Sequence, residues 1–238
     1  MQTIIFDVDD TLYDQSLSFY RTVRHLISNE LSDEQIAAIF KASRKHSEYL
    51  FDLSEAGKIT RKEWQIGRMK RALEDFNIKI TEEEAENFHN HYVNEQSNIE
   101  LFPEIKELLQ ELKLAGYPLG ILTNGEKNHQ QMKIDQLQLH QWIRPDHTFI
   151  SGAYGYAKPM KEIFEIVEHQ LHLSNDQITY IGDSYEKDII GAKSVGWKAI
   201  WMNHRKKAKP KGINLSPDNE VYSAKQLYEL IKVEFLTD

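Results

Sequence analysis

The sequence contains no cysteine, and this absence removes three kinds of site at once. A disulfide framework, a thiolate metal site and a cysteine nucleophile are all excluded. Basic residues are also in the minority, because 29 Lys and Arg are set against 37 Asp and Glu, a net charge of −8. Proteins that coat nucleic acid or an anionic membrane present basic surfaces. We therefore expect neither nucleic acid nor a membrane among the partners.

Long apolar runs are also missing. No stretch approaches the ~18 consecutive apolar residues of a membrane-spanning helix. The first residues lead into a strand-like run rather than a secretory signal. We therefore expect a cytoplasmic protein. At 238 residues, the chain has room for one large domain or for a core that carries an insertion.

Beyond residue 102, short apolar runs alternate with amphipathic stretches. The runs that predict strands span residues 118–123, 148–151, 178–181 and 199–202. The stretches that predict helices span residues 103–116, 159–171 and 187–195. Strands that alternate with helices indicate parallel strands joined by crossovers. The sequence therefore predicts an α/β fold, with an open, parallel, Rossmann-like sheet between two layers of helices.

The segment between the first strand and residue 98 shows no strand pattern. Instead, Ser32, Thr60 and Thr81 each precede a Glu or Gln by three positions, which is the capping-box signature of a helix start. We therefore expect an inserted helical cap. The predicted domains are a discontinuous α/β core of residues 1–14 and 98–238 and a cap of residues 15–97. The aromatic side chains expected to share the core of the cap are Tyr20, Phe40, Tyr49, Phe51, Trp64, Phe76, Phe88 and Tyr92.

The most informative motif follows the first apolar run, residues 4–6. Asp7 and Asp9 are two positions apart, so at the end of a strand both side chains point the same way, and Thr11 follows them. A site that keeps two like charges this close usually holds a cation, or separates their pKa values so that one carboxylate is a nucleophile and the other handles protons. The alternative is a turn-capping pair, because Asp is common where a chain leaves a strand.

Further polar residues follow the other predicted strands. They are Thr123-Asn124-Gly125, Lys158-Pro159 and the acidic segment Gly182-Asp183-Ser184-Tyr185-Glu186-Lys187-Asp188. Ligands of open α/β sheets bind at the carboxyl ends of the strands. Carboxylates, a hydroxyl, an amide and an ammonium gathered there suit phosphoryl transfer, in which positioning and charge stabilisation provide most of the catalysis. Taken alone, Thr123 and Asn124 would be interpreted as turn residues, Lys158 as a surface lysine, and Asp188 as a helix cap.

Together, these motifs resemble the haloacid dehalogenase superfamily, in the branch with a helical cap after the first motif. The four motifs of that family are matched in order by Asp7, Asp9 and Thr11, by Thr123, by Lys158, and by Gly182, Asp183 and Asp188. The resemblance runs from the first predicted strand to the last. It implies a hydrolase that forms a covalent aspartyl phosphate.

The resemblance also implies a role for each residue. Asp7 would attack phosphorus, while Asp9 would protonate the leaving alcohol and later deprotonate the hydrolytic water. The implied cofactor is Mg²⁺, held by the side chains of Asp7 and Asp183 and the backbone carbonyl of Asp9. Asp188 would be a further ligand or a partner of the ligands. The residues implied in phosphate binding are Thr123, the backbone amide of Asn124, and Lys158.

The expected partner is a small phosphorylated metabolite, bound by a monomer or a homodimer. The shorter runs that resemble pyrimidine 5′-nucleotidase-like phosphatases are residues 9–13, 150–152, 156–159, 191–193 and 201–203. This resemblance implies nucleoside 5′-monophosphates as substrates. A sugar-phosphate phosphatase, a phosphomutase and a non-catalytic binding protein are the alternatives on the same core. Tyr20 or Trp64 could stack on a base, although core packing is favoured for both.

Three other features are interpreted as lying outside the site. Asp10 and Asp14 are expected to be structural or solvent-facing. The histidines are not expected to bind a metal, because His89 and His91 fall on opposing sides of a predicted helix. The basic run at residues 205–211 is expected to form a solvated loop.

Overall fold

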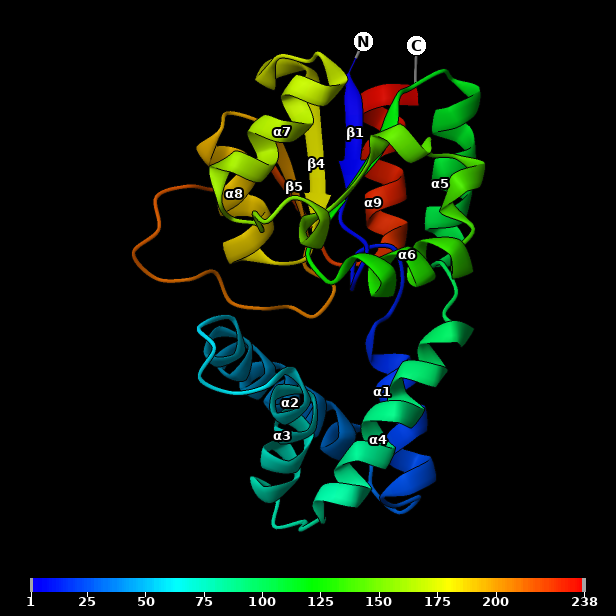
Figure 1. The fold of residues 1–238 in the computed structure, drawn as a ribbon. Helices are drawn as coiled ribbons and strands as arrows, with labels where there is room; N and C mark the ends of the chain where they lie inside the picture. The colour runs from blue at the N-terminus through cyan, green and yellow to red at the C-terminus, as the bar shows by residue number, and fades with distance from the viewer. Residues whose placement is uncertain (1, 237–238) are drawn as a thin grey trace. The chain divides into compact units, whose positions relative to one another are not determined.

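A six-stranded parallel sheet lies at the centre of one of the two units of the chain (Figure 1). The structure is a computed structural model that describes residues 2–236. The sheet unit comprises Met1–Asp14 and Glu100–Asp238, and the second unit comprises Gln15–Ile99. The sheet unit is therefore assembled from two separate pieces of the chain.

The strands lie in the order β3-β2-β1-β4-β5-β6, and each strand is parallel to its neighbours. Their bounds are Thr3–Phe6 (β1), Leu119–Thr123 (β2), Thr148–Ile150 (β3), Ile178–Gly182 (β4), Lys198–Met202 (β5) and Asn219–Val221 (β6). The predicted open α/β architecture is confirmed. Strand β6 was not predicted, because it has three residues and only Val221 among them is buried.

Helices cover both faces of the sheet, with α5 and α9 on one face and α7 and α8 on the other (Figure 1). Their bounds are Pro103–Leu114 (α5), Lys161–Leu171 (α7), Ile190–Ser194 (α8) and Ala224–Ile231 (α9), and Lys127–Gln136 (α6) follows β2. The buried stripe of α5 is Ile105, Leu108, Leu109 and Leu112, spaced as a helix requires. Apolar spacing of this kind packs a helix onto a sheet.

Shorter turns connect these elements. The 3₁₀ turns span Gln96–Asn98, Leu139–Gln141, Pro145–His147, Ser151–Ala153 and Asn175–Gln177, and the π-helical turns span Tyr185–Ile189 and Lys232–Leu236. The prediction of one helix at 187–195 was wrong at its start, since α8 begins only at Ile190. The wide turn before it accompanies an inward Asp188, whose buried carboxylate accepts the backbone N–H of Ser184 at 2.8 Å.

The strand order reverses between β1 and β4. The chain goes from β1 to β2 and β3 on one side, and then crosses to β4, β5 and β6 on the other. At such a switch point the loops after the two central strands run in opposite directions and leave a crevice at their carboxyl ends. Asp7 and Asp183 directly follow β1 and β4. The fold therefore places these two carboxylates at the standard ligand position of an open α/β sheet.

The second unit is built from helices α1 to α4. Their bounds are Ser16–Leu26 (α1), Asp33–Glu55 (α2), Arg61–Glu74 (α3) and Glu82–Glu95 (α4). Capping boxes at Thr60 and Thr81 begin α3 and α4, and Ser32 exchanges the same two bonds with Gln35 before α2. The three predicted helix starts are confirmed. Within residues 2–236, no helix combines the length and the apolar character needed to cross a bilayer.

Phe19 is central to the core of this helical unit. Its ring centroid lies 5.2 Å from Phe40, 5.5 Å from Phe88 and 6.0 Å from Tyr92, all in edge-to-face arrangements. Edge-to-face contacts place the positive edge of one ring against the negative face of another. Aromatic side chains from α1, α2 and α4 therefore hold the unit together.

The predicted aromatic core was wrong for three side chains. Tyr49, Phe51 and Phe76 are exposed to 57%, 42% and 37%. Tyr49 and Phe51 lie in α2, where the neighbouring buried positions are Ser47 and Leu50, whereas Phe76 follows the end of α3. A helix that buries one stripe turns the residues between those positions toward solvent.

Candidate active site

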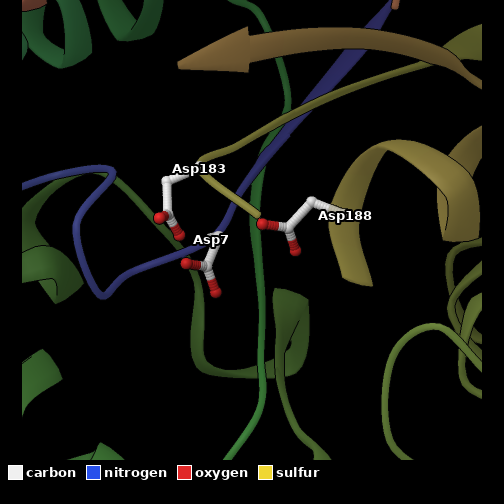
Figure 2. Close-up of side chains that lie close together, drawn as sticks. All are labelled: Asp7, Asp183 and Asp188. Carbon is white, nitrogen blue, oxygen red and sulfur yellow. The ribbon is translucent and has the colours of Figure 1, made fainter. Parts of the chain in front are cut away.

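Three carboxylates meet at the carboxyl ends of β1 and β4. Asp7 follows β1, Asp183 follows β4, and Asp188 lies in the π-helical turn that comes next. One oxygen of each lies within 4.8 Å of the others. Figure 2 shows the three side chains close together. The side chains of Asp7 and Asp188 are only 8% and 1% exposed. Buried like charges are costly unless positive charge compensates them.

Lys158 supplies positive charge from within the protein. Its buried ammonium lies 2.8 Å from Oδ1 of Asp7, 2.7 Å from Oδ1 of Asp188 and 2.7 Å from the hydroxyl of Tyr180. These three contacts match the three N–H donors of an ammonium. The Tyr180 hydroxyl in turn donates to the backbone carbonyl of Leu122 at 2.8 Å. The ammonium is therefore fixed between two carboxylates.

Asn124 and Gly182 set the position of this cluster. The Asn124 amide donates to the carbonyl of Lys158 and accepts its backbone N–H, both at 2.9 Å, which joins the end of β2 to the lysine. At Gly182, an added Cβ would lie 2.5 Å from Cγ of Asp188. Glycine is therefore required there for the carboxylate of Asp188 to reach the cluster.

Burial is the main cause that raises the pKa of Asp7 from its ordinary value of 3.8 to about 7. Lys158 opposes this rise, whereas Asp188 and Asp183 add to it. Burial likewise raises the pKa of Asp183 to about 6, against the opposing charge of Lys207. Burial by itself lowers the pKa of Lys158, but Asp188 and Asp7 raise it above the ordinary value overall. The metal-free cluster therefore retains protons that the unfolded chain releases.

These pKa values predict how the stability of the metal-free protein depends on pH. Because the pKa values of Asp7 and Asp183 rise from 3.8 to about 7 and about 6 on folding, their contribution is most favourable below pH 3.8 and is lost as pH rises toward 7. We expect the melting temperature in EDTA to fall by on the order of 5 °C across this window.

Excess Mg²⁺ should reverse the fall, with an effect that grows with pH because a metal binds the ionised carboxylates. Thermal melts at a series of pH values, with and without Mg²⁺, measure both effects. The pKa of Asp10 is lowered by His204 and Arg205 despite its burial, so Asp10 affects stability only below this window. A melting temperature that rises steadily from about pH 4 to 7 in EDTA would contradict the assignment.

Asp9 and Thr123 are held by side chains of α6. The Lys133 ammonium lies 2.8 Å from each carboxylate oxygen of Asp9. The Gln130 amide nitrogen lies 2.7 Å from the hydroxyl of Thr123 and 3.1 Å from Oδ2 of Asp9, and Tyr13 donates its hydroxyl to Oδ1 of Asp9. Sequence reasoning missed Gln130 and Lys133. The one available signal was their spacing of three residues in the segment after Thr123.

The prediction of a solvated basic loop was wrong for Arg205, whose side chain is 27% exposed, whereas Lys207 is 46% exposed although it is paired. Arg205 binds both oxygens of Asp10, at 3.0 and 2.7 Å, and also pairs with Asp14. Lys207 lies 2.6 Å from Oδ2 of Asp183. The acidic residues after β1 and β4 attract these cations, which no local pattern reveals. Asp10 has the structural role that was expected.

The predicted site residues therefore fall into two connected groups. Asp7, Asp183, Asp188 and Lys158 form the central cluster, and Asp9 and Thr123 meet beside it through Gln130. Among the residues that the structure describes, the group suited to a metal contains aspartates and no histidine.

Residues 1–196 match the sequence model of the haloacid dehalogenase-like hydrolase family. This span includes all the motif residues described above. The chain belongs to this family. Three relatives of this haloacid dehalogenase-like hydrolase cover most of its length. They are YfnB of Bacillus subtilis (27% identical; 98% of this chain and 96% of that protein), a glyceraldehyde 3-phosphate phosphatase of Pyrococcus furiosus (28%; 87% and 83%) and the pyrimidine 5′-nucleotidase YjjG of Escherichia coli (27%; 96% and 96%).

A solved structure shares the fold of this family member. The crystal structure of YfnB matches with a TM-score of 0.72 and 24% sequence identity, and covers 97% of this chain and 98% of that one. The match extends over both the sheet and the helical segments. The fold with an inserted helical unit is therefore common to the two haloacid dehalogenase-like hydrolases.

Proposed function

We propose that this protein is a Mg²⁺-dependent phosphatase that hydrolyses small phosphomonoesters through an aspartyl phosphate on Asp7. The observation that carries the proposal is the buried cluster of Asp7, Asp183 and Asp188 around Lys158 at the strand switch point. Relatives named as phosphatases and as a nucleotidase support the same class of reaction.

The donor set of the cluster fits a hard divalent cation. Mg²⁺ prefers oxygen ligands and takes few from the protein, and three carboxylate oxygens within 4.8 Å provide such a set. We assign the side chains of Asp7 and Asp183 and the backbone carbonyl of Asp9 as ligands. Asp188 would be a further ligand or a partner of the ligands. YfnB has been crystallised with magnesium, which is consistent with this assignment. When bound, the ion would neutralise charge on the phosphoryl group.

The reaction would proceed in two displacements at phosphorus. A carboxylate oxygen of Asp7 attacks, the ester P–O bond breaks, and Asp9 gives its proton to the leaving alkoxide. Water then attacks the phosphorus of the aspartyl phosphate while Asp9 takes a proton from it. Inorganic phosphate leaves and the carboxylate of Asp7 is restored. Thr123, the backbone N–H of Asn124 and Lys158 would hold the phosphoryl oxygens.

Nucleoside 5′-monophosphates are our first proposal for the substrate. The short runs that resemble nucleotidases and the similarity to YjjG support it. The similarity to glyceraldehyde 3-phosphate phosphatases supports a second candidate, a sugar or triose phosphate. Base stacking by Tyr20 or Trp64 gains no support, because the Tyr20 hydroxyl donates to the carbonyl of Asp33 and the Trp64 N–H to that of Ser47, within the helical unit.

A phosphate-release assay over nucleoside monophosphates, glyceraldehyde 3-phosphate and hexose phosphates tests the proposal. We expect release that requires Mg²⁺, is abolished by EDTA, and is fastest with a nucleoside monophosphate. A triose or hexose phosphate as the best substrate would favour the second candidate. Interconversion of sugar phosphates without net release would indicate a mutase. Absence of any turnover would contradict the enzymatic proposal and favour a binding protein.

A further inference from the structure

The ion pair between Lys133 and Asp9 is unusual for its burial and geometry. The side chain of Lys133 is 3% exposed, and its ammonium lies 2.8 Å from both oxygens of a carboxylate that is itself 22% exposed. A buried ammonium is destabilising unless it is paired, so an apolar side chain would be the ordinary choice for an inward position of α6. The chain instead places a cation directly on Asp9.

Two more side chains donate hydrogen bonds to this carboxylate. Tyr13, itself buried, donates its hydroxyl to Oδ1 of Asp9, and the Gln130 amide lies 3.1 Å from Oδ2. Both oxygens of the Asp9 carboxylate therefore have hydrogen-bond donors from surrounding side chains. We call Lys133, Gln130 and Tyr13 the Asp9 clamp. The clamp fixes both the position and the plane of the carboxylate.

We propose that the Asp9 clamp, with Lys133 as its charged member, positions the Asp9 carboxylate for proton transfer to the leaving group. This inference rests on the proposed phosphatase function. Lys133 touches Asp9 rather than the reacting atoms, so it is a positioning residue. A purely structural ion pair, which only joins α6 to the segment after β1, is the competing explanation.

The two explanations differ in how the effect of a mutation depends on the leaving group. An alkoxide needs a proton as it leaves, whereas p-nitrophenolate is stable without one. Misplacing a catalytic group by about 1 Å can cost 10²-fold in rate. We therefore expect Lys133→Met to lower kcat/KM for an alkyl phosphomonoester by about 10–100-fold, and that for p-nitrophenyl phosphate by less than about 3-fold. A structural defect would lower both alike.

The matched control is Lys127→Met, an exposed position on the same helix, which should change neither value. In an Asp9→Asn background, adding Lys133→Met should cause no further loss with the alkyl ester, because the lysine acts through Asp9. Tyr13→Phe removes one donor from the clamp with almost no change in shape. Tyr13→Phe should also lower kcat/KM for the alkyl ester selectively, but by a smaller factor. This variant tests the clamp even if Lys133→Met does not fold.

Equal losses with both esters, or no loss with either, overturn the inference. So does additivity of Lys133→Met with Asp9→Asn. These outcomes presuppose an active wild-type protein. If the wild-type protein releases phosphate from neither ester, the proposed function fails and this inference fails with it. The two kinds of failure are thus distinguished by the wild-type assay alone.

Discussion

Replacing Asp7 with Asn is expected to lower turnover by more than about 10⁴-fold while the protein stays folded. The amide has no carboxylate to attack phosphorus, yet it keeps the shape of the side chain beside Lys158. Burial raises the pKa of Asp7, so removing this charge relieves an unfavourable interaction at neutral pH. We therefore expect kcat to be lost while the free energy of unfolding, measured by urea denaturation, does not decrease.

Asp146→Asn, at an exposed position, is the matched control and should keep full activity. Trapping with beryllium fluoride, or acid quenching followed by mass spectrometry, should mark Asp7 in the wild type and leave the variant unmarked. Turnover of a folded Asp7→Asn protein within tenfold of wild type would exclude Asp7 as the nucleophile. A loss of activity accompanied by unfolding would instead indicate a structural role.

Replacing Lys158 with Met should destabilise the metal-free protein by about 3–5 kcal/mol near pH 8. The change removes the ammonium that lies 2.8 Å from Asp7 and 2.7 Å from Asp188, and leaves two buried carboxylates facing each other. The destabilisation should shrink near pH 5, where protonation relieves the repulsion. Chemical denaturation in EDTA at the two pH values measures it. Turnover should fall on the order of 10²–10³-fold, because a phosphoryl contact is also lost.

Lys161→Met, which removes a lysine that is 66% exposed, is the control and should change stability little. Saturating Mg²⁺ should restore part of the stability of the Lys158 variant, since the ion offers another cation to the same carboxylates. An equal loss of stability at both pH values would show that the lysine matters for packing rather than for charge.

Much of the fold and of the central cluster could be predicted from local patterns. Short apolar runs and helical stripes made the parallel sheet predictable, because each element buries its own apolar face. Asp7 is predicted by its spacing of two residues from Asp9 directly after an apolar run, and Asp183 by its match to the acidic motif of the family. Lys158 could be assigned to the site only together with the other motifs, because a single lysine in a sequence does not indicate a function.

The features that could not be predicted, helix α6 and the pairing of Arg205, depend on charge pairing between residues far apart in the sequence. Helix α6 escaped prediction because its buried positions include Gln130 and Lys133, so it lacks a continuous apolar stripe. Its polar inward face is the part that reaches the site. The basic run predicts a solvated Arg205, yet Arg205 pairs with Asp10, 195 positions away in the chain. Local periodicity holds no information about such partners.

The central position of β1 affects the order in which the protein folds. Ile4 pairs with Leu119 and Thr3 pairs with Ile178, so the middle strand of the sheet is synthesised long before either neighbour. Pairing of this kind closes large loops and slows folding. During translation, the apolar segment that precedes Asp7 therefore stays without its strand partners until β2 and then β4 have been made. The carboxylates of Asp7 and Asp183 can therefore meet only after β4 has been made and has paired with β1.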